Sequence, residues 1–416
     1  MRLTPDHDLR ARAFARLDAR LTRETGRTVA LALSGGGDSV ALLRLATDWA
    51  RARGRSVLAL TVDHRLNPDS GGWTKFAGEA ARAAGADWRG LSWDGDKPTT
   101  GLTAAARAAR HGLIADAARE AGASVVLFAH TADDIAEADL MRAEGSTLGR
   151  VREWSPSPAW PQGRGLMLLR PLLGERRAGL RDWLAGEGAD WIEDPANADP
   201  RFGRSRARQA LAGAAPRLID QASAQTGVRP TMDGEAMARV DRDVSARALA
   251  AALVCVGGGS TPPRGARLEA LIARLKAGED FAATLCGTRI EAVGARVRLM
   301  REAGELRRRD ISPLALALTP GVEAVWDGRF VFCADRLGWS VVPARGRLAS
   351  LSDTDRAEIN RLPAATRGAW PVLIRDDAVA PVLAGEGVER RGLVAERLRL
   401  ALDETTHEDD LISATR

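Results

Sequence analysis

The sequence predicts an α/β protein: a doubly wound parallel sheet in the first half, followed by a helical module and a small α+β module. Between residues 28 and 143, short apolar runs alternate with longer segments of helical pattern. Such alternation indicates βαβ units, whose strands lie parallel in one sheet. The runs are apolar throughout, as expected for strands that helices cover on both faces.

Each element follows from this pattern in chain order. The expected strands are 28–33, 56–62, 87–93, 124–129 and 166–172. The expected helices are 39–52, 73–85, 102–120, 133–143 and 175–188. Segment 152–165 is rich in proline, serine and glycine, which predicts a loop.

The length of 416 residues exceeds one ordinary domain of about 100–200 residues. The polar stretch 212–234 has the composition of a linker. We therefore expect an α/β catalytic domain over 1–215, a mostly helical module over 216–305 and a small α+β module over 306–416. The acidic segment 403–410 predicts a frayed tail.

The apolar runs and the cysteines of the sequence indicate the cellular compartment of the protein. No stretch reaches the ~18 consecutive apolar residues of a membrane span, and the N-terminus is charged where a signal peptide is apolar. Cys255, Cys286 and Cys333 are far apart and form no CxxC pair, which fits a reducing compartment and indicates neither a zinc site nor a disulfide framework. We expect a cytoplasmic protein with no membrane association.

The charge allows two interpretations. The formal net charge is +5, and nearly all basic residues are arginine, since Lys75, Lys97 and Lys276 are the only lysines. Arginine binds phosphate through two parallel hydrogen bonds, which favours a nucleic-acid partner. The same charge is also compatible with plain solubility, and the arginine preference with a GC-rich genome.

A glycine-rich turn joins the first expected strand to the first expected helix. It reads SGGGDS at 34–39 and points backbone N–H groups and a helix N-terminus at one spot, which makes an anion site. No lysine follows the glycines, so the turn is not a G-x-x-x-x-G-K-[ST] loop. It resembles the S-G-G-x-D-S pyrophosphate loop of the Rossmann-like N-type ATP pyrophosphatases, which cleave ATP between its α- and β-phosphates. Asp38 is itself an anion, so its expected role is to hold Mg²⁺ or a cationic substrate group near the phosphates.

Three carboxylates follow the strand at 124–129, where open α/β sheets bind ligands. Asp133 and Glu137 are four residues apart and Asp134 and Glu137 are three apart, so the carboxylates share one helical surface. They are candidates for a cation site. The alternative is that acidic residues in a first turn merely stabilise the helix dipole.

Basic residues supply two further candidates. Arg107 and Arg110 share one face of the alanine-rich helix, either as phosphate ligands or as ordinary solvated side chains. His64 follows the second strand at the ligand-binding edge, either as a functional group or as a satisfied histidine.

Taken together, five segments resemble the tRNA(Ile)-lysidine synthetase family in order and spacing. They are SGGGDS at 34–39, VDHRL at 62–66, AARAAR at 105–110, HTADDIAEA at 130–138 and EDPANADPRFGRSRAR at 193–208. The family's D-P-x-N…R…R element is matched by Asp194, Pro195, Asn197, Arg204 and Arg208. The resemblance is strong over about residues 25–210 and weaker to the end. Departures from the family pattern are Ala138, His111 and Ser205.

The resemblance implies an ATP-dependent ligase that attaches free L-lysine to C2 of the wobble cytidine of a CAU-anticodon tRNA(Ile). The cytosine O2 would attack the α-phosphorus of ATP, releasing pyrophosphate, and the lysine ε-amine would then displace AMP. Lysidine changes the codon read from AUG to AUA and the tRNA identity from Met to Ile. The implied substrates and cofactor are tRNA(Ile), L-lysine, ATP and Mg²⁺. The chain could also form a homodimer.

The resemblance also implies a role for each site residue. The ATP ligands would be Ser34, Gly35, Gly36, Gly37, Asp38 and Ser39. Asp38 would also hold the metal and act in catalysis with Arg107 and Asp133. The lysine ligands would be Asp133, Asp134 and Glu137, and the contacts to tRNA or nucleotide would be His64, Arg110, Arg204 and Arg208.

The C-terminal half is expected to recognise the tRNA. Arg307–Arg309 and Arg390–Arg391 would contact phosphates. Trp326, Trp339 and Trp370 would either stack on bases or belong to a hydrophobic core.

Three other functions are less consistent with the sequence. A tRNA thiolase of the same fold needs a reactive cysteine or a cysteine-bound cluster near the loop, and the first 254 residues contain no cysteine. An amidotransferase relative would carry a glutaminase domain, and none is recognisable. A tRNA- or nucleotide-binding protein with a decayed site would not be expected to keep both the glycine loop and the acidic cluster.

Overall fold

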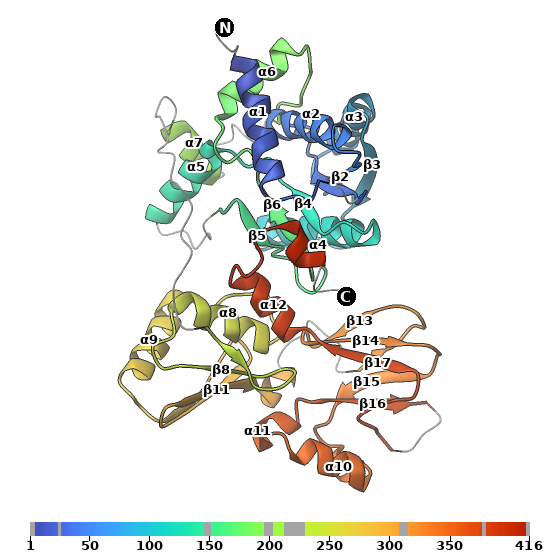
Figure 1. Ribbon diagram of the computed structural model, residues 1–416, viewed down its shortest axis with the longest axis vertical. Helices are drawn as coiled ribbons and strands as arrows, with labels where there is room; N and C mark the ends of the chain where they lie inside the picture. The colour runs from blue at the N-terminus through green and yellow to red at the C-terminus, as the bar shows by residue number, and fades with distance from the viewer. Residues whose placement is uncertain are drawn as a thin grey trace. The chain divides into compact units, whose positions relative to one another are not determined.

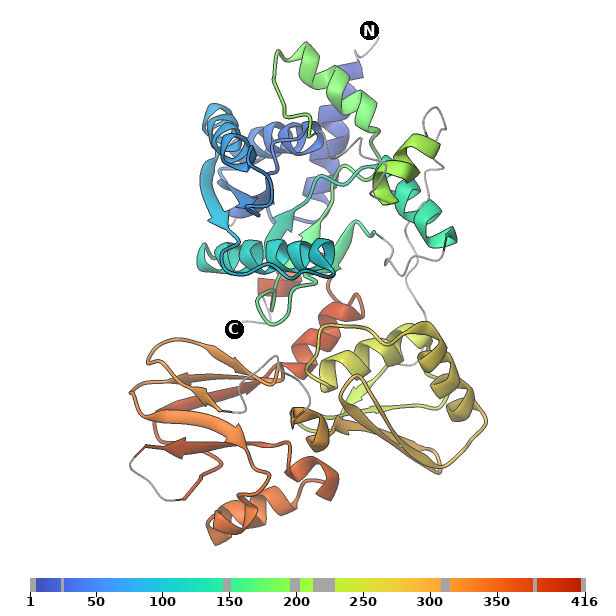
Figure 2. The ribbon, with the colours of Figure 1, turned by 180° about the vertical axis from the view of Figure 1, so that it is seen from behind.

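The computed structural model describes residues 5–23, 26–144, 151–194, 203–211, 229–307, 315–376 and 380–412. The chain divides into two compact units (Figures 1 and 2). The catalytic unit comprises residues 1–223 and 405–416, and the inserted unit comprises residues 224–404. In the described residues, no helix is both long and apolar enough to cross a membrane.

The catalytic unit is built on a six-stranded sheet in the order β3-β2-β1-β4-β6-β5. The strands are β1 (Val29–Ala32), β2 (Val57–Asp63), β3 (Asp87–Ser92), β4 (Val125–Leu127), β5 (Trp154–Pro156) and β6 (Met167–Leu169). All neighbours pair in parallel except β5, which is antiparallel to β6. The predicted parallel sheet is therefore confirmed, with an edge strand added inside the segment expected to be a loop.

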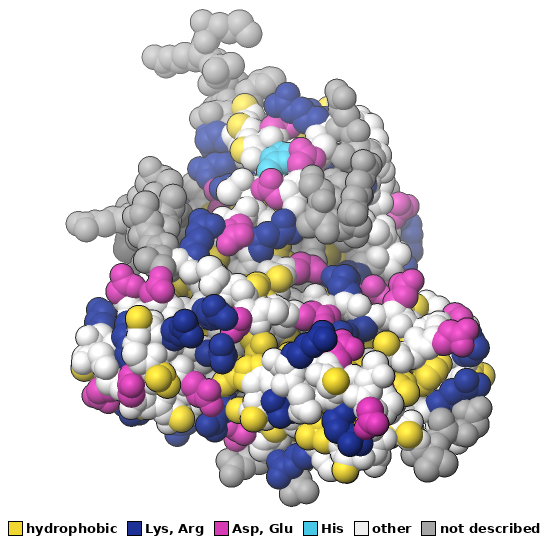
Figure 3. Space-filling view, turned by 60° about the horizontal axis from the view of Figure 1, so that its bottom comes forward, with side chains coloured by type: hydrophobic (Ala, Val, Ile, Leu, Met, Phe, Trp, Pro, Cys, Tyr) yellow, Lys and Arg dark blue, Asp and Glu magenta, His cyan; other side chains and the backbone are white. Residues whose placement is uncertain are grey.

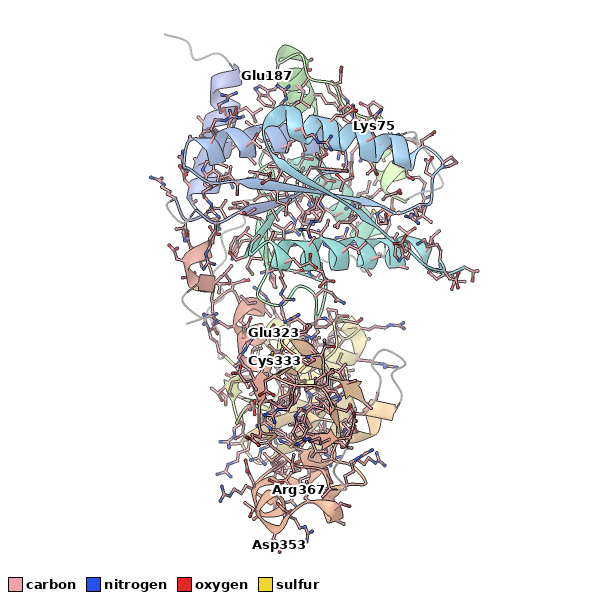
Figure 4. The ribbon with its side chains drawn as sticks, turned by 90° about the vertical axis from the view of Figure 1, so that its right-hand side faces the viewer. Lys75, Glu187, Glu323, Cys333, Asp353 and Arg367 are labelled. Atoms are coloured by element: carbon pink, nitrogen blue, oxygen red, sulfur yellow. The ribbon has the colours of Figure 1, made fainter. Side chains whose placement is uncertain are left out.

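Helices cover both faces of this sheet. They are α1 (Pro5–Asp18), α2 (Gly37–Arg51), α3 (Ser70–Ala84), α4 (Leu102–Glu120), α5 (Ala132–Ala143), α6 (Arg177–Gly186), α7 (Gly203–Ala210) and α13 (Glu408–Ile412). Figure 4 shows α3, marked by Lys75, on one face and α4 on the other. Strands β1, β2 and β4 are largely buried between these layers, whereas the edge strand β3 is mostly exposed.

The C-terminal segment corrects one expectation. Instead of fraying, it returns to the catalytic unit as α13, and Glu408 is fully buried. Its carboxylate accepts two hydrogen bonds from Arg55, at 2.7 and 2.9 Å, and further ones from the Thr22 N–H and Ser124 Oγ. A buried arginine partner thus overrides the polar composition that suggested a solvated tail.

The inserted unit contains three sheets. The first has strands β7 (Thr231–Met232), β8 (Ala238–Val240), β9 (Phe281–Leu285), β10 (Thr288–Val293) and β11 (Arg296–Arg301). The others have β12 (Leu316–Ala317), β15 (Trp339–Pro343) and β16 (Pro371–Arg375), and β13 (Ala324–Trp326), β14 (Phe330–Ala334) and β17 (Val388–Gly392). The helices are α8 (Ala246–Val256), α9 (Gly265–Lys276), η2 (Ala303–Arg307), η3 (Leu348–Ser350), α10 (Asp353–Asn360), α11 (Ala364–Arg367) and α12 (Val394–Ala401).

One hydrophobic core runs through this unit from Ala236 to Leu398. Trp326, Trp339 and Trp370 are buried in it, which decides for core packing over base stacking at these three positions. The segment expected to be mostly helical combines two helices with five strands. The side chain of Arg307, and residues 308–309, lie outside the described part of the chain.

Candidate active site

The site lies at the carboxyl edge of the sheet, between β1 and β4. The chain leaves β1 toward β2 and β3 on one side, and β4 and β6 extend the sheet on the other. At such a reversal of strand order, open α/β sheets usually bind their ligands beyond the carboxyl ends of the strands. The loop after β1 carries the SGGGDS motif, and the loop after β4 leads into α5.

The SGGGDS loop is held in shape by its own hydroxyls. Ser39 Oγ donates to the Gly36 carbonyl at 2.8 Å and lies 3.1 Å from Ser34 Oγ. Gly35 has φ +85°, a backbone conformation that favours glycine, and a Cβ there would lie 2.6 Å from Ile192 Cδ1, so that side chain would also have to shift. Helix α2 begins at Gly37, so its first-turn N–H groups point at the loop and form an anion site.

Asp38 lies in the first turn of α2, directly after the glycines of the loop. Its Oδ2 accepts a hydrogen bond from Arg177 Nε at 3.1 Å. Its Oδ1 is buried and has no hydrogen-bond partner among the described residues. Burial raises the pKa of Asp38, and the nearby charge of Asp134 raises it further, although Arg177 opposes both. A cation at Oδ1 would relieve this cost.

The three carboxylates of α5 have different partners. Asp133 accepts from Arg176 and, at 2.8 Å, from the backbone N–H of Arg177, so it anchors the start of α6. Burial alone would raise its pKa, but these hydrogen bonds hold the pKa below its usual value. Asp134 accepts from the N–H and hydroxyl of Thr131, which closes the first turn of α5.

Glu137 is the most buried of the three, with a side chain 2% exposed. Its Oε1 accepts from Arg177 at 2.9 Å and from Arg208 at 3.0 Å. Its Oε2 is buried and has no hydrogen-bond partner among the described residues. Glu137 therefore presents a second free carboxylate oxygen in the same cluster as Asp38, because Arg177 contacts both residues.

Arg177 was missed by the sequence analysis. It is the first residue of α6, it follows β6, and it reaches Asp38, Asp134 and Glu137. Several carboxylates around one guanidinium raise the pKa of Arg177. The available signal was its place just beyond a strand's carboxyl end, the criterion that singled out His64 and Asp133.

Basic side chains from α4 and α7 gather beside the acidic cluster. Burial, together with the charges of Arg107 and Arg204, lowers the pKa of Arg110 to about 10. Burial and Arg204 also lower the pKa of Arg107, so these three arginines lie close enough to repel one another. Arg110 Nε is buried and has no partner among the described residues. An anion bound here would relieve the repulsion.

Histidines line the same region. His64 packs edge-on against Trp93 with ring centroids 6.0 Å apart, and burial and the charge of Arg110 lower its pKa. His111 stacks on Phe128, and Phe128 stacks on His130. Burial lowers the pKa of His111 to about 3, so this ring is neutral at pH 7.

Arg170 completes this group, and it was not among the predicted site residues. It donates to His130 Nδ1 at 3.2 Å and to the Arg152 carbonyl at 2.6 Å. Pro195 and Asn197 lie outside the described residues.

The carboxylates of this site suit Mg²⁺ only if a phosphate supplies further ligands. The described residues contain no group of three or more histidine, cysteine, aspartate or glutamate side chains arranged to hold a metal ion. Mg²⁺ is commonly bound by one or two carboxylates plus substrate phosphates and water. The free Asp38 Oδ1, beside the anion-binding turn, is a ligand of that kind.

Comparison with known proteins agrees with this geometry. Residues 9–215 match the family described as PP-loop domain. The tRNA(Ile)-lysidine synthase of Caulobacter vibrioides is 48% identical over 397 residues, which cover 93% of this chain and 96% of that protein. The tRNA(Ile)-lysidine synthase of Mesorhizobium japonicum is 36% identical, over 79% of this chain and 76% of that protein.

A solved structure is a more distant match. The U34-tRNA thiolase NcsA from Methanococcus maripaludis is 15% identical with a TM-score of 0.41, over 49% of this chain and 72% of that chain. This likeness carries no argument about function. The two synthases match nearly all of this chain or most of it, at identities above 30%. The chain belongs to the tRNA(Ile)-lysidine synthase family.

Proposed function

We propose that this chain ligates free L-lysine to the wobble cytidine of a CAU-anticodon tRNA(Ile), with conversion of ATP to AMP and pyrophosphate. Membership of the synthase family supports the activity and the use of ATP. One structural observation carries the site assignment. Two buried carboxylate oxygens, on Asp38 and Glu137, have no hydrogen-bond partner in the part of the chain that the structure describes, and both belong to one cluster beside the SGGGDS turn.

The anion-binding turn serves the first step. Ser34, Ser39 and the N–H groups that begin α2 hold the pyrophosphate that leaves when cytosine O2 attacks the α-phosphorus. Mg²⁺, when bound at Asp38 Oδ1, supplies charge neutralisation on the phosphates. Gly35, Gly36 and Gly37 let the backbone approach the phosphates closely.

The acidic cluster serves the second step. Glu137 Oε2 and Asp134 receive the ammonium group of lysine, and a carboxylate there accepts the proton that the ε-amine must lose before it attacks C2. Asp133 supports this site indirectly, because its contacts to Arg176 and the Arg177 N–H fix the start of α6. Lysine therefore enters between the loop and α5.

The arginines from α4 and α7 receive the RNA. Arg107 and Arg110 lie close to Arg204, and this positive region fits the phosphate beside the flipped cytidine or the α-phosphate under attack. Arg208 shields Glu137, and His64, neutral through its lowered pKa, offers a hydrogen-bonding edge. Arg107 stabilises charge that develops on the phosphate.

We assign tRNA recognition to the inserted unit, residues 224–404, which holds most of the expected modules 216–305 and 306–416. On the face shown in Figure 3, basic side chains lie among acidic and hydrophobic ones. Charge pattern alone therefore does not mark the tRNA surface there. Truncating the chain near residue 220 would also remove Glu408 and leave Arg55 unpaired, so charge-reversal variants of the full chain are the cleaner test.

AMP release tests the function. The complete mixture contains the chain, ATP, Mg²⁺, L-lysine and CAU-anticodon tRNA(Ile), and a parallel mixture omits lysine. We expect AMP release to depend on lysine, and the tRNA to gain one lysine residue at the wobble cytidine. Release of AMP at the same rate without lysine would show that another nucleophile is used, and the lysine assignment would be wrong.

A further inference from the structure

Arg177 connects the two motifs of the site through one planar group. Its Nε lies 3.1 Å from Asp38, one terminal nitrogen lies 2.9 Å from Glu137 and the other lies 3.5 Å from Asp134. Each nitrogen of the guanidinium thus faces a different carboxylate. The side chain is only 15% exposed, so these contacts are largely shielded from water.

This arrangement divides the oxygens of the cluster into two sets. Arg177 contacts Asp38 Oδ2 and Glu137 Oε1. The other oxygens, Asp38 Oδ1 and Glu137 Oε2, are the two that have no partner among the described residues. A rigid guanidinium that holds one oxygen of each carboxylate also fixes the direction of the other.

We propose that Arg177 is a positioning residue: it holds Asp38 and Glu137 so that their free oxygens receive the cationic groups of the substrates. This inference rests on the proposed function, because the cation it concerns is the ammonium group of lysine. Arg177 acts through the carboxylates. Together with Arg208 on Glu137 it offsets two of the three charges of Asp38, Asp134 and Glu137, which leaves negative charge for a further cation.

The opposite role makes the opposite prediction. If Arg177 merely occupied the lysine site as a competing cation, its removal would lower the KM for lysine. If Arg177 positions the cluster, its removal leaves buried carboxylates without their counter-charge, a costly state. The cluster would then rearrange or take up protons, and the KM for lysine would rise.

The test is chemical rescue of Arg177→Ala, with Arg89→Ala as the matched control. Arg89 is 43% exposed and pairs with Glu120 at the surface, outside the cluster. For Arg177→Ala we expect the KM for lysine to rise about tenfold or more, and by more than the KM for ATP, since charge-assisted hydrogen bonds are lost. Millimolar guanidinium chloride, but not sodium chloride, should restore the KM for lysine.

Arg177→Lys provides a second variant, which keeps the positive charge but lacks the planar guanidinium that contacts several carboxylates at once. We expect it to have an intermediate KM for lysine. Arg89→Ala should show neither the KM change nor the rescue. An unchanged or lowered KM for lysine in Arg177→Ala, or a raised KM that guanidinium does not reverse, would overturn the proposal. If the wild-type chain shows no lysine-dependent AMP release, the proposed function fails instead, so the two failures are distinguishable.

Discussion

Two groups of buried charges lie at opposite edges of the sheet in the catalytic unit. At the amino edge, Arg55 and Glu408 form a fully buried pair whose remaining hydrogen bonds go to Thr22, Arg27 and Ser124. At the carboxyl edge, Arg177 contacts three carboxylates, yet one oxygen each of Asp38 and Glu137 has no partner among the described residues.

This difference in hydrogen bonding distinguishes a pair that stabilises the fold from a cluster that is suited to ligand binding. A buried charge that is fully paired stabilises the fold only weakly when formed, but removing its partner is costly. A buried carboxylate oxygen without a partner carries a desolvation cost that a bound cation can offset. The amino-edge pair therefore holds the C-terminal segment in place, and we expect the carboxyl-edge cluster to bind ligands.

Breaking the amino-edge pair should have the largest effect on stability. Glu408→Gln leaves the Arg55 charge buried without a counter-charge, which should lower the free energy of unfolding by about 3–5 kcal/mol. Urea denaturation measures this change. Glu120→Gln is the matched control, since Glu120 pairs with Arg89 at the surface and should cost no more than about 1 kcal/mol. Equal losses of stability in the two variants would contradict the conclusion that the Arg55–Glu408 pair holds the C-terminal segment in place.

Removing the charge of Asp38 should have the next largest effect, and on activity. Asp38→Asn keeps the size of the side chain but loses an ionic ligand, so AMP formation should fall about a hundredfold or more, given that even outer-shell changes cost 10–100-fold. Binding of tRNA, measured by filter retention, should stay near wild type. AMP formation within tenfold of wild type would argue against a metal or cation at Asp38.

The buried His111 should make a smaller contribution to the free energy of unfolding, and this contribution should depend on pH. In the unfolded chain His111 has the ordinary histidine pKa of about 6.5, but burial lowers its pKa in the folded protein to about 3. Between these values the unfolded state binds more protons, so stability should fall as the pH falls, by up to about 1.4 kcal/mol per pH unit from this residue.

His111→Phe should remove that contribution while keeping the stack on Phe128. The measurement is urea denaturation of both proteins from pH 7 to pH 5. The difference in stability between His111→Phe and wild type should move in favour of the variant as the pH falls. A difference that is independent of pH would mean that His111 does not titrate on unfolding.

The sequence predicted those parts of the molecule that local pattern determines. Continuous apolar runs located β1, β2 and β4, and the SGGGDS motif located the turn that begins α2. The carboxylates of α5 were found because they follow a strand at the ligand-binding edge. Strand β5 was missed, since a three-residue edge strand containing proline has no distinctive pattern.

Contacts between distant segments were not predictable in this way. Arg177 lies 139 residues from Asp38, and Glu408 lies 353 residues from Arg55. Charge composition suggested that residues 403–410 were solvated, and only the folded chain brings the buried arginine to Glu408. The separate roles of Asp133, Asp134 and Glu137 likewise depend on partners supplied by α6 and α7.

The most direct test of the comparison is the free energy of unfolding of Glu137→Gln, measured beside its lysine-dependent AMP formation. Glutamine keeps the shape of the side chain and removes one negative charge from a cluster with unpaired buried oxygens. We predict a loss of stability much smaller than that of Glu408→Gln, because Arg177 keeps Asp38 and Asp134 as counter-charges, while AMP formation with lysine is largely lost. A loss of stability as large as that of Glu408→Gln, with lysine-dependent activity retained, would contradict the division between a binding edge and a stabilising edge.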